Sequence, residues 1–200
     1  MEQNAQKTKF DLATWSNLAN IGSNSAISGI AQMVNQDLKV TTFNLEEVSM
    51  KNASSLIGKP DDQIVGIYLM FTGNADGHIM LAFPPPTAYE LVDMAMGLPP
   101  GSTDTLGEME KSVLGEIGNI AGSFFLNAIA DIAGSRLSPS PPVVVVDMAG
   151  AIMGSILAEV FEERESAFAI KLVFATPTRQ IEGRFLVLPM SGSIASKQEG

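Results

Sequence analysis

Apolar residues recur at steps of three and four positions in two long segments of the chain, which predicts two long amphipathic helices. The first runs from Phe10 to about Asn35, with its apolar positions at Leu12, Trp15, Leu18, Ile21, Ile27, Ile30 and Val34. The second runs from about Thr105 to Ala133. Thr105 and Glu108 have the spacing of a capping box, which predicts that this helix begins at Thr105.

Segments rich in β-branched and aromatic residues predict strands after each long helix. In the first half they are Leu38–Met50, Ile64–Thr72 and His78–Phe83. In the second half they are Val143–Val146, Ala167–Ala175 and Ile181–Leu188. The Gly and Asn residues of Gly73–Gly77 predict a hairpin connection. Shorter helices fit Thr87–Met96 and Met148–Phe161, and a strand is the alternative for the latter.

Breaks in the pattern divide the chain into two similar halves. Gly97–Thr105 holds two prolines and two glycines and predicts a linker, and the Ser138–Pro142 cluster interrupts the second half. We expect a polar lead-in over 1–9, one domain over 10–189 with halves of about 10–96 and 105–189, and a flexible tail over 190–200.

The same order of elements in both halves indicates an internal duplication. A shift of 99 residues aligns identical residues in the two long helices: Asn20 with Asn119, Ile21 with Ile120, Ile30 with Ile129, and Ala31 with Ala130. The predicted fold is therefore of the α/β (α+β) class. It is an internally duplicated pseudo-twofold sandwich, with two long helices on one face of a shared, mostly antiparallel sheet.

Composition favours a globular protein that acts on proteins or small molecules. Of 200 residues, 46% are hydrophobic and 17% charged, enough to build a core. The net charge of −10 argues against nucleic acid and anionic membranes as partners. No cysteine is present, which excludes thiolate metal sites and fits a reducing compartment. The polar start MEQNAQKTKF resembles no secretory signal, so we expect a cytoplasmic protein.

One polar stripe follows the second long helix. Its members, spaced by three or four residues, are Ser112, Glu116, Asn119, Ser123 and Asn127. The opposite, apolar face is expected to hold Leu114, Ile117, Ile120, Ala121, Phe124, Ala128, Ile129 and Ile132. Such a stripe is often only solvated surface. Three glycines beside it, at 115, 118 and 122, indicate close packing either on the protein's own sheet or against a docking partner.

The motif Ser112-x3-Glu116-x2-Asn119-x22-Pro142 resembles the signature of the CheC/CheX/FliY family of chemotaxis phosphatases. The texts GEIGNIAGSFFLNAIADIAG and PPVVVVDMAGAI resemble the same family. The resemblance extends from about Leu12 to Pro189, and the duplication and length indicate a CheC-like member.

This resemblance implies a phosphatase that hydrolyses the aspartyl phosphate of a CheY-type response regulator. Asn119 would orient the attacking water and Glu116 would pair with a lysine of the regulator, with Ser112 and Pro142 in support. The chain would bind no cofactor or metal itself, because Mg²⁺ is expected in the regulator. The alternative is a non-catalytic adaptor that binds the regulator or the deamidase CheD.

The family carries a second copy of the signature on its first long helix, and in this chain that copy is degraded. Under the 99-residue shift, the positions of Ser112, Glu116 and Pro142 are occupied by Ala13, Asn17 and Phe43. Only the asparagine of the signature is retained, as Asn20. Asn17 and Asn20 therefore form a vestigial second site. His78 is expected to be structural, since no nucleophile is placed beside it.

Overall fold

The computed structural model describes residues 12–49, 56–160, 166–177 and 179–191. The helices are α1 (Leu12–Val34), α2 (Pro85–Met96), α3 (Glu108–Ala133) and α4 (Ala149–Val160). The strands are β1 (Lys39–Ser49), β2 (Gln63–Gly73), β3 (Asp76–Phe83), β4 (Leu137–Pro139), β5 (Val143–Met148), β6 (Ser166–Thr176) and β7 (Arg179–Ser191). The segment predicted as helix or strand over Met148–Phe161 is thus helical as far as Val160, and Phe161 lies outside the described residues.

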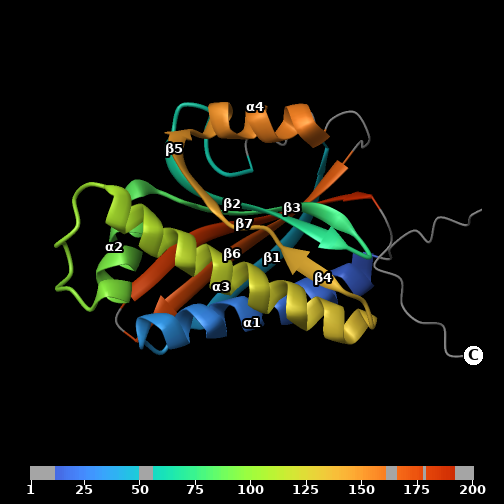
Figure 1. Cartoon of the computed structure of the whole chain (residues 1–200), viewed down its shortest axis with the longest axis horizontal. Helices are drawn as coiled ribbons and strands as arrows, with labels where there is room; N and C mark the ends of the chain where they lie inside the picture. The colour runs from blue at the N-terminus through green and yellow to red at the C-terminus, as the bar shows by residue number, and fades with distance from the viewer. Residues whose placement is uncertain (1–11, 50–55, 161–165, 178, 192–200) are drawn as a thin grey trace, which may run out of the picture.

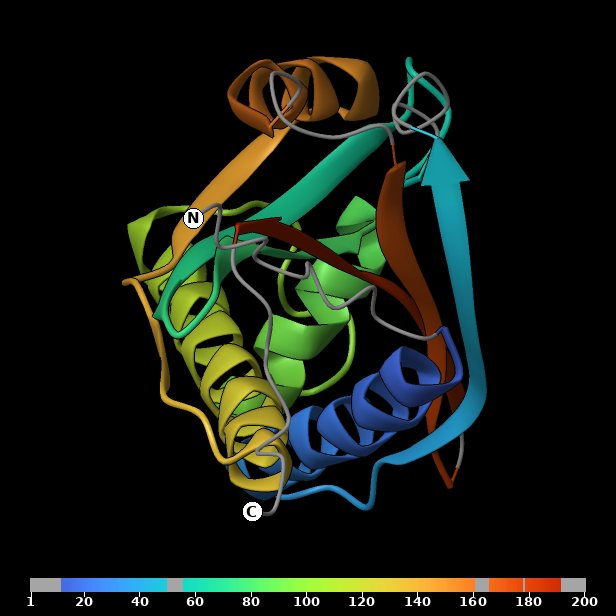
Figure 2. The same ribbon diagram turned by 90° about the vertical axis from the view of Figure 1, so that its right-hand side faces the viewer.

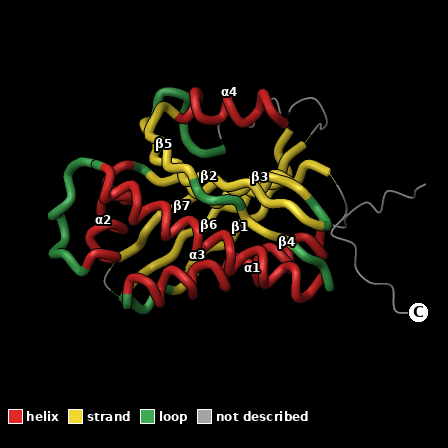
Figure 3. The backbone as a smooth tube through the Cα atoms, viewed as in Figure 1, coloured by secondary structure: helices red, strands yellow, loops and turns green. Residues whose placement is uncertain are grey.

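The described strands form one sheet in the order β1-β6-β7-β3-β2, and both β4 and β5 pair with β2. Every pairing among them is antiparallel. Helices α1 and α3 lie on one face of the sheet and α4 lies on the other (Figure 1, and by element type in Figure 3). The sheet curls around α1, α2 and α3, so that these three helices occupy its concave side (Figure 2).

The sheet has the pseudo-twofold arrangement that the duplication predicts. Its centre is the pair β3 and β7, one strand from each half. On either side, the first strand of each half pairs with the middle strand of the other: β1 with β6, and β5 with β2. The predicted fold class, a duplicated sandwich with two long helices on one face, is confirmed.

Alternation along β2 divides the interior into two cores. Val65, Ile67, Leu69 and Phe71 are buried on the concave side, where the main core joins the sheet to α1, α2 and α3. The residues between them point to the convex side, where a smaller core lies beneath α4. This period of two turns Ile67 and Leu69 toward α3, which packs on them through Gly118 and Gly122.

The start of α3 differs from the prediction. The helix begins at Glu108, its N-cap is Gly107, and no side chain caps it. The predicted capping box between Thr105 and Glu108 is therefore wrong. Glu108 cannot reach back as the third helical residue of a capping box, because it is itself the first helical residue.

The buried face of α3 is also partly different from the predicted one. Phe124 and Ile132 are 37% and 53% exposed, whereas Phe125 and Leu126 are buried. The buried residues still recur at steps of three and four, from Leu114 to Ala133. Phe124 lies at the edge of this stripe, where it contacts Gly29 of α1, while Phe125 packs over Gly22 of the same helix.

Short segments at the element ends refine the predicted boundaries. Strand β4 (Leu137–Pro139) extends into the expected break over Ser138–Pro142, and its three residues pair with β2. Helix α2, predicted from Thr87, begins two residues earlier at Pro85, as proline is tolerated at the start of a helix. Strand β7 includes Met190 and Ser191, which were predicted to begin the tail, and 192–200 lie outside the described residues.

The loop between α2 and α3 is organised by a buried carboxylate, Asp93, which is 2% exposed. Its Oδ2 accepts hydrogen bonds from the backbone N–H groups of Gly101 (2.8 Å) and Ser102 (3.1 Å). Its Oδ1 accepts from the backbone N–H of Thr103 (2.9 Å) and from the Thr103 hydroxyl (2.7 Å). No sequence pattern indicates this role, because the donors are mostly backbone groups of the loop.

Replacement of Asp93 by asparagine is expected to destabilise the protein by about 2 kcal/mol at pH 7. An amide has one acceptor oxygen, so its NH2 group would face two of the four donors, at least one of them a backbone N–H. Urea denaturation of the wild-type protein and the variant measures the difference. Equal midpoints and slopes would show that the four hydrogen bonds contribute nothing to stability.

The same carboxylate makes stability depend on pH. Burial alone would raise the pKa of Asp93, but the hydrogen bonds from Thr103, Gly101 and Ser102 outweigh it and lower the pKa below its usual value. A lowered folded-state pKa stabilises the protein above the unfolded-state value of about 4, and this stability is lost as the pH falls through the folded-state pKa. The difference from Asp93→Asn should therefore shrink below about pH 4.

Candidate functional site

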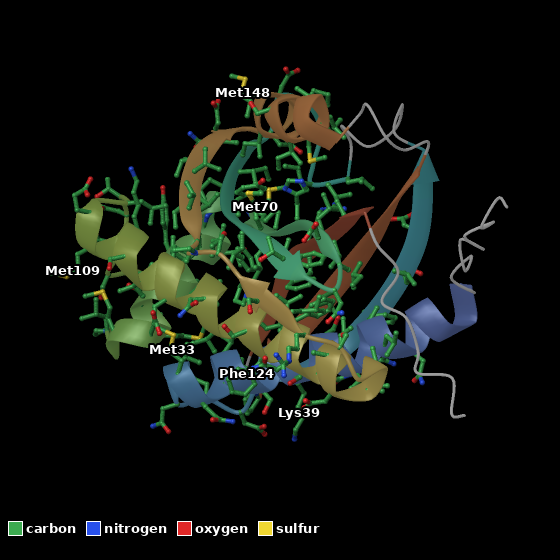
Figure 4. The ribbon with its side chains drawn as sticks, turned by 45° about the vertical axis from the view of Figure 1, so that its right-hand side comes forward. Met33, Lys39, Met70, Met109, Phe124 and Met148 are labelled. Carbon is green, nitrogen blue, oxygen red and sulfur yellow. The ribbon has the colours of Figure 1, made fainter. Side chains whose placement is uncertain are left out.

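The predicted site residues line one open groove of about 710 Å³ on the side of α3 that faces away from α1. Ser112, Glu116 and Asn119 lie on the α3 wall, and Pro142 lies on the wall opposite. The full lining is Glu108, Lys111, Ser112, Gly115, Glu116, Asn119, Pro139, Ser140, Pro141, Pro142 and Val144. The structure thus brings together all four residues of the predicted signature. In Figure 4, Met109 marks the end of α3 at which the groove begins.

The wall opposite α3 is the segment from β4 to β5, and two strand pairings with β2 hold it in place. Between them, the Ser140 backbone N–H donates to the carbonyl of Met70 (2.8 Å), and the Met70 N–H donates to the Ser140 hydroxyl (3.0 Å). These bonds fix the chain directly before Pro141 and Pro142. Sequence reasoning missed Ser140, because its importance comes from a pairing with a strand seventy residues away.

The hairpin between β2 and β3 anchors the chain just after α3. The Arg136 backbone N–H donates to the side-chain oxygen of Asn74 (2.7 Å), and the Asn74 N–H donates to the Arg136 carbonyl (2.9 Å). Gly73 has a φ of 140°, and a Cβ there would lie 2.1 Å from the Arg136 oxygen. Glycine is therefore required at this position for both reasons.

Glu116 and Asn119 present unengaged polar groups to the groove. Glu116 is exposed and Asn119 is half-buried. Within the described residues, neither side chain takes part in a hydrogen bond or an ion pair. They lie three residues apart and so project from neighbouring turns of one rigid helix. A partner can therefore reach both without first breaking an internal contact.

The three glycines of α3 answer the question that the sequence left open. A Cβ at Gly118 would lie 2.3 Å from Ile67 of the sheet, and one at Gly122 would lie 3.2 Å from Leu69. These two glycines allow close packing on the protein's own sheet. A Cβ at Gly115 would come no closer than 3.8 Å to any atom, the nearest being Cγ of Pro142, so this glycine only leaves more space in the groove that it lines.

The degraded second copy on α1 has a different local structure. Asn17 and Asn20 are exposed, and the amide of Asn24 donates to the side-chain oxygen of Asn20 at 2.6 Å and to its carbonyl at 2.9 Å. A separate groove follows α1, lined from Asn24 to Val40, but it includes neither Asn17 nor Asn20. Unlike Asn119, Asn20 is engaged within its own helix.

His78 is buried on the convex side of the sheet. One of its ring nitrogens forms a hydrogen bond with the Tyr68 hydroxyl, and the two rings stack with centroids 5.6 Å apart. It lies outside the groove. In the described part of the chain, no cluster of three or more His, Asp or Glu residues could hold a metal ion.

Among the helices of the described residues, α3 alone is long and apolar enough to cross a membrane by length and composition. Half of its apolar window is buried in this structure, and the core helix of a soluble protein meets the same criteria.

Comparison with known proteins points to a single family. The model of the CheC-like family matches residues 109–146, a stretch that contains Ser112, Glu116, Asn119 and Pro142. The CheY-P phosphatase CheC of Bacillus subtilis is 29% identical over 155 residues, which cover 76% of this chain and 74% of that protein. The chain is therefore similar to the CheC-like family over the stretch that holds the signature, and to a relative named as a CheY-P phosphatase over most of its length.

Solved structures of the family share the fold of this CheC-like chain. The crystal structure of Thermotoga maritima FliY superposes with a TM-score of 0.73 at 19% identity and covers 88% of both chains. A chain of the Borrelia burgdorferi CheX–CheY–BeF3–Mg complex superposes with a TM-score of 0.59 at 15% identity, covering 86% of this chain and 97% of that one.

Proposed function

We propose that this protein hydrolyses the aspartyl phosphate of a CheY-type response regulator in chemotaxis signalling, with the α3 groove as its active site. The observation that carries the proposal is the groove itself, which unites Ser112, Glu116, Asn119 and Pro142 although Pro142 is distant in sequence. The relative in Bacillus subtilis is named as a CheY-P phosphatase, which supports the same reaction.

Asn119 is the proposed catalytic residue. A neutral amide can both accept from and donate to a water molecule, and so can hold it in line with the phosphorus atom. Phosphoryl transfer depends chiefly on such positioning and on charge stabilisation, so no proton-abstracting base is required of this chain. The magnesium ion that neutralises the phosphoryl charge is expected in the regulator.

Glu116 is the proposed docking residue. Its exposed carboxylate has no partner within the described residues and can pair with a lysine of the regulator. A charge-assisted hydrogen bond of this kind fixes orientation as well as adding affinity. Ser112 lies one turn earlier and supports the same surface, while Pro142 shapes the opposite wall.

A decay assay tests the function directly. A CheY-type regulator phosphorylated with a small phosphodonor is expected to lose its phosphate faster with this protein than in buffer alone. Decay equal to that in buffer, together with binding of the phosphorylated regulator, would favour the non-catalytic adaptor. Binding of CheD alone would favour the adaptor as well.

Removal of the amide at the second site should leave this activity unchanged. Asn20→Ala is expected to accelerate decay as the wild-type protein does, because the Asn20 amide is held by Asn24 and lies outside both grooves. The measurement is the rate of phosphate loss at equal protein concentration. A reduced rate in Asn20→Ala would show that the α1 site still contributes.

A further inference from the structure

The groove contains one positive charge, on Lys111. Two acidic residues also line it, Glu108 and Glu116, and Lys111 is the only basic residue in the lining. Within the described part of the chain, Lys111 forms no ion pair. The protein has 22 acidic and 12 basic residues, so a lysine in the proposed active site that forms no ion pair with the described acidic residues requires an explanation.

Helical spacing places Lys111 and Glu116 on opposite flanks of the site. The two residues are five positions apart, so their side chains leave the helix axis about 140° apart at 100° per residue. Ser112 and Asn119 project between these two directions. The proposed water-holding amide therefore lies between a positive flank and a negative flank.

The contacts of α3 show which of the two flanks faces the wall formed by the β4–β5 segment. Gly115 and Gly118 both face Pro142, since a Cβ built at either position would lie 3.8 or 3.6 Å from its ring carbons. Lys111 precedes them by four and seven residues and so lies in the same row, toward the wall formed by the β4–β5 segment. Lys111 is half-buried there, whereas Glu116 is exposed on the outer rim.

We propose that Lys111 is a specificity-determining residue that contacts an anionic group of the phosphorylated partner. This inference rests on the proposed function. An acyl phosphate and the carboxylates that surround it in a receiver domain are negatively charged. A lysine ammonium, carried on a flexible stem, interacts with such groups as a point charge. Because Glu116 lies on the other flank, the site favours a partner that presents an anionic group to Lys111 and a cationic group to Glu116.

A charge that keeps contact with solvent, as the half-buried Lys111 does, acts mainly on association and on its dependence on salt. The proposed contact should therefore appear in KM rather than in kcat, and it should weaken as ionic strength screens it. A purely structural role would instead change thermal stability, with no salt-dependent effect on KM.

The experiment compares Lys111→Gln, Lys111→Arg and Lys39→Gln with the wild-type protein in the decay assay over a range of NaCl concentrations. Lys39 serves as the control for loss of a lysine charge, because it also lines a groove but that groove contains no residue of α3. Unlike Lys111, it is exposed and forms an ion pair with Asp37 (3.1 Å). Figure 4 shows it well away from Met109 at the start of α3.

Lys111→Gln is expected to raise KM roughly 3- to 10-fold at low salt, to leave kcat within about twofold, and to flatten the salt dependence of KM. Lys111→Arg, which retains the charge, should stay close to the wild-type protein, and Lys39→Gln should match it. An unchanged KM and salt dependence in Lys111→Gln would overturn the inference while the proposed function stands. An equal rise of KM in Lys111→Arg with a lowered melting temperature would also overturn it. Absence of activity in the wild-type protein would instead mark failure of the proposed function itself.

Discussion

Replacement of Asn119 by alanine is expected to slow dephosphorylation of the regulator roughly 100-fold, because a water molecule that is not held in line reacts only by chance. The variant should fold normally. Asn119 is half-buried in the groove wall and has no hydrogen bond within the described residues, so its truncation breaks no internal contact. The decay rate at saturating regulator measures kcat, and a melting curve verifies the fold.

Asn127→Ala is the matched control for this substitution. Asn127 belongs to the same polar stripe of α3, two turns further on, but it is exposed and lies outside the groove. Its truncation should leave the decay rate unchanged. If Asn119→Ala retained the wild-type kcat, the amide would not be the group that positions water. Equal loss in both variants would point to the stripe as a whole rather than to the groove.

Substitution of Gly118 by valine is expected to destabilise the protein by about 3 kcal/mol. The first added carbon would lie 2.3 Å from Cγ2 of Ile67, which is fully buried on β2 and branched at its own Cβ. A branched side chain in a packed core has no free rotamer into which it can withdraw. Either α3 or β2 must move. Helix α3 forms one wall of the groove, and β2 holds the opposite wall in place by pairing with β4 and β5. Chemical denaturation measures the loss.

Gly115→Ala is the control for glycine content in the same helix. A Cβ at position 115 meets nothing closer than 3.8 Å, and alanine favours the helix by about 1 kcal/mol over glycine. This variant should therefore be as stable as the wild-type protein or more so. A Gly118→Val protein that unfolds at the wild-type midpoint would contradict the close packing of α3 on β2.

Much of the fold could be predicted because its signals are periodic and local. The steps of three and four that predict α1 and α3, and the hairpin between β2 and β3, depend on neighbouring residues. The 99-residue repeat added the pseudo-twofold arrangement, which the pairing of β1 with β6 and of β5 with β2 reproduces. The predicted apolar face of α3 was wrong at Phe124 and Ile132, since apolar residues occupy more than one side of this helix and periodicity does not show which of them are covered.

By itself, the sequence determined the residues of the candidate site. Ser112, Glu116 and Asn119 share a face of α3 because the period of the helix leaves no alternative, and the spacing to Pro142 connects them with the family. It also determined that the first copy is degraded, since Asn17 stands where the signature has glutamate.

Only the tertiary structure decided that these residues form a groove. Pairing of β4 and β5 with β2, through contacts between distant segments, brings Pro142 opposite Gly115 and places Lys111 beside that wall. The structure likewise separated the glycines into two that pack on the sheet and one that opens the groove. No local pattern contains this information, because it depends on which atoms the sheet places against the helix.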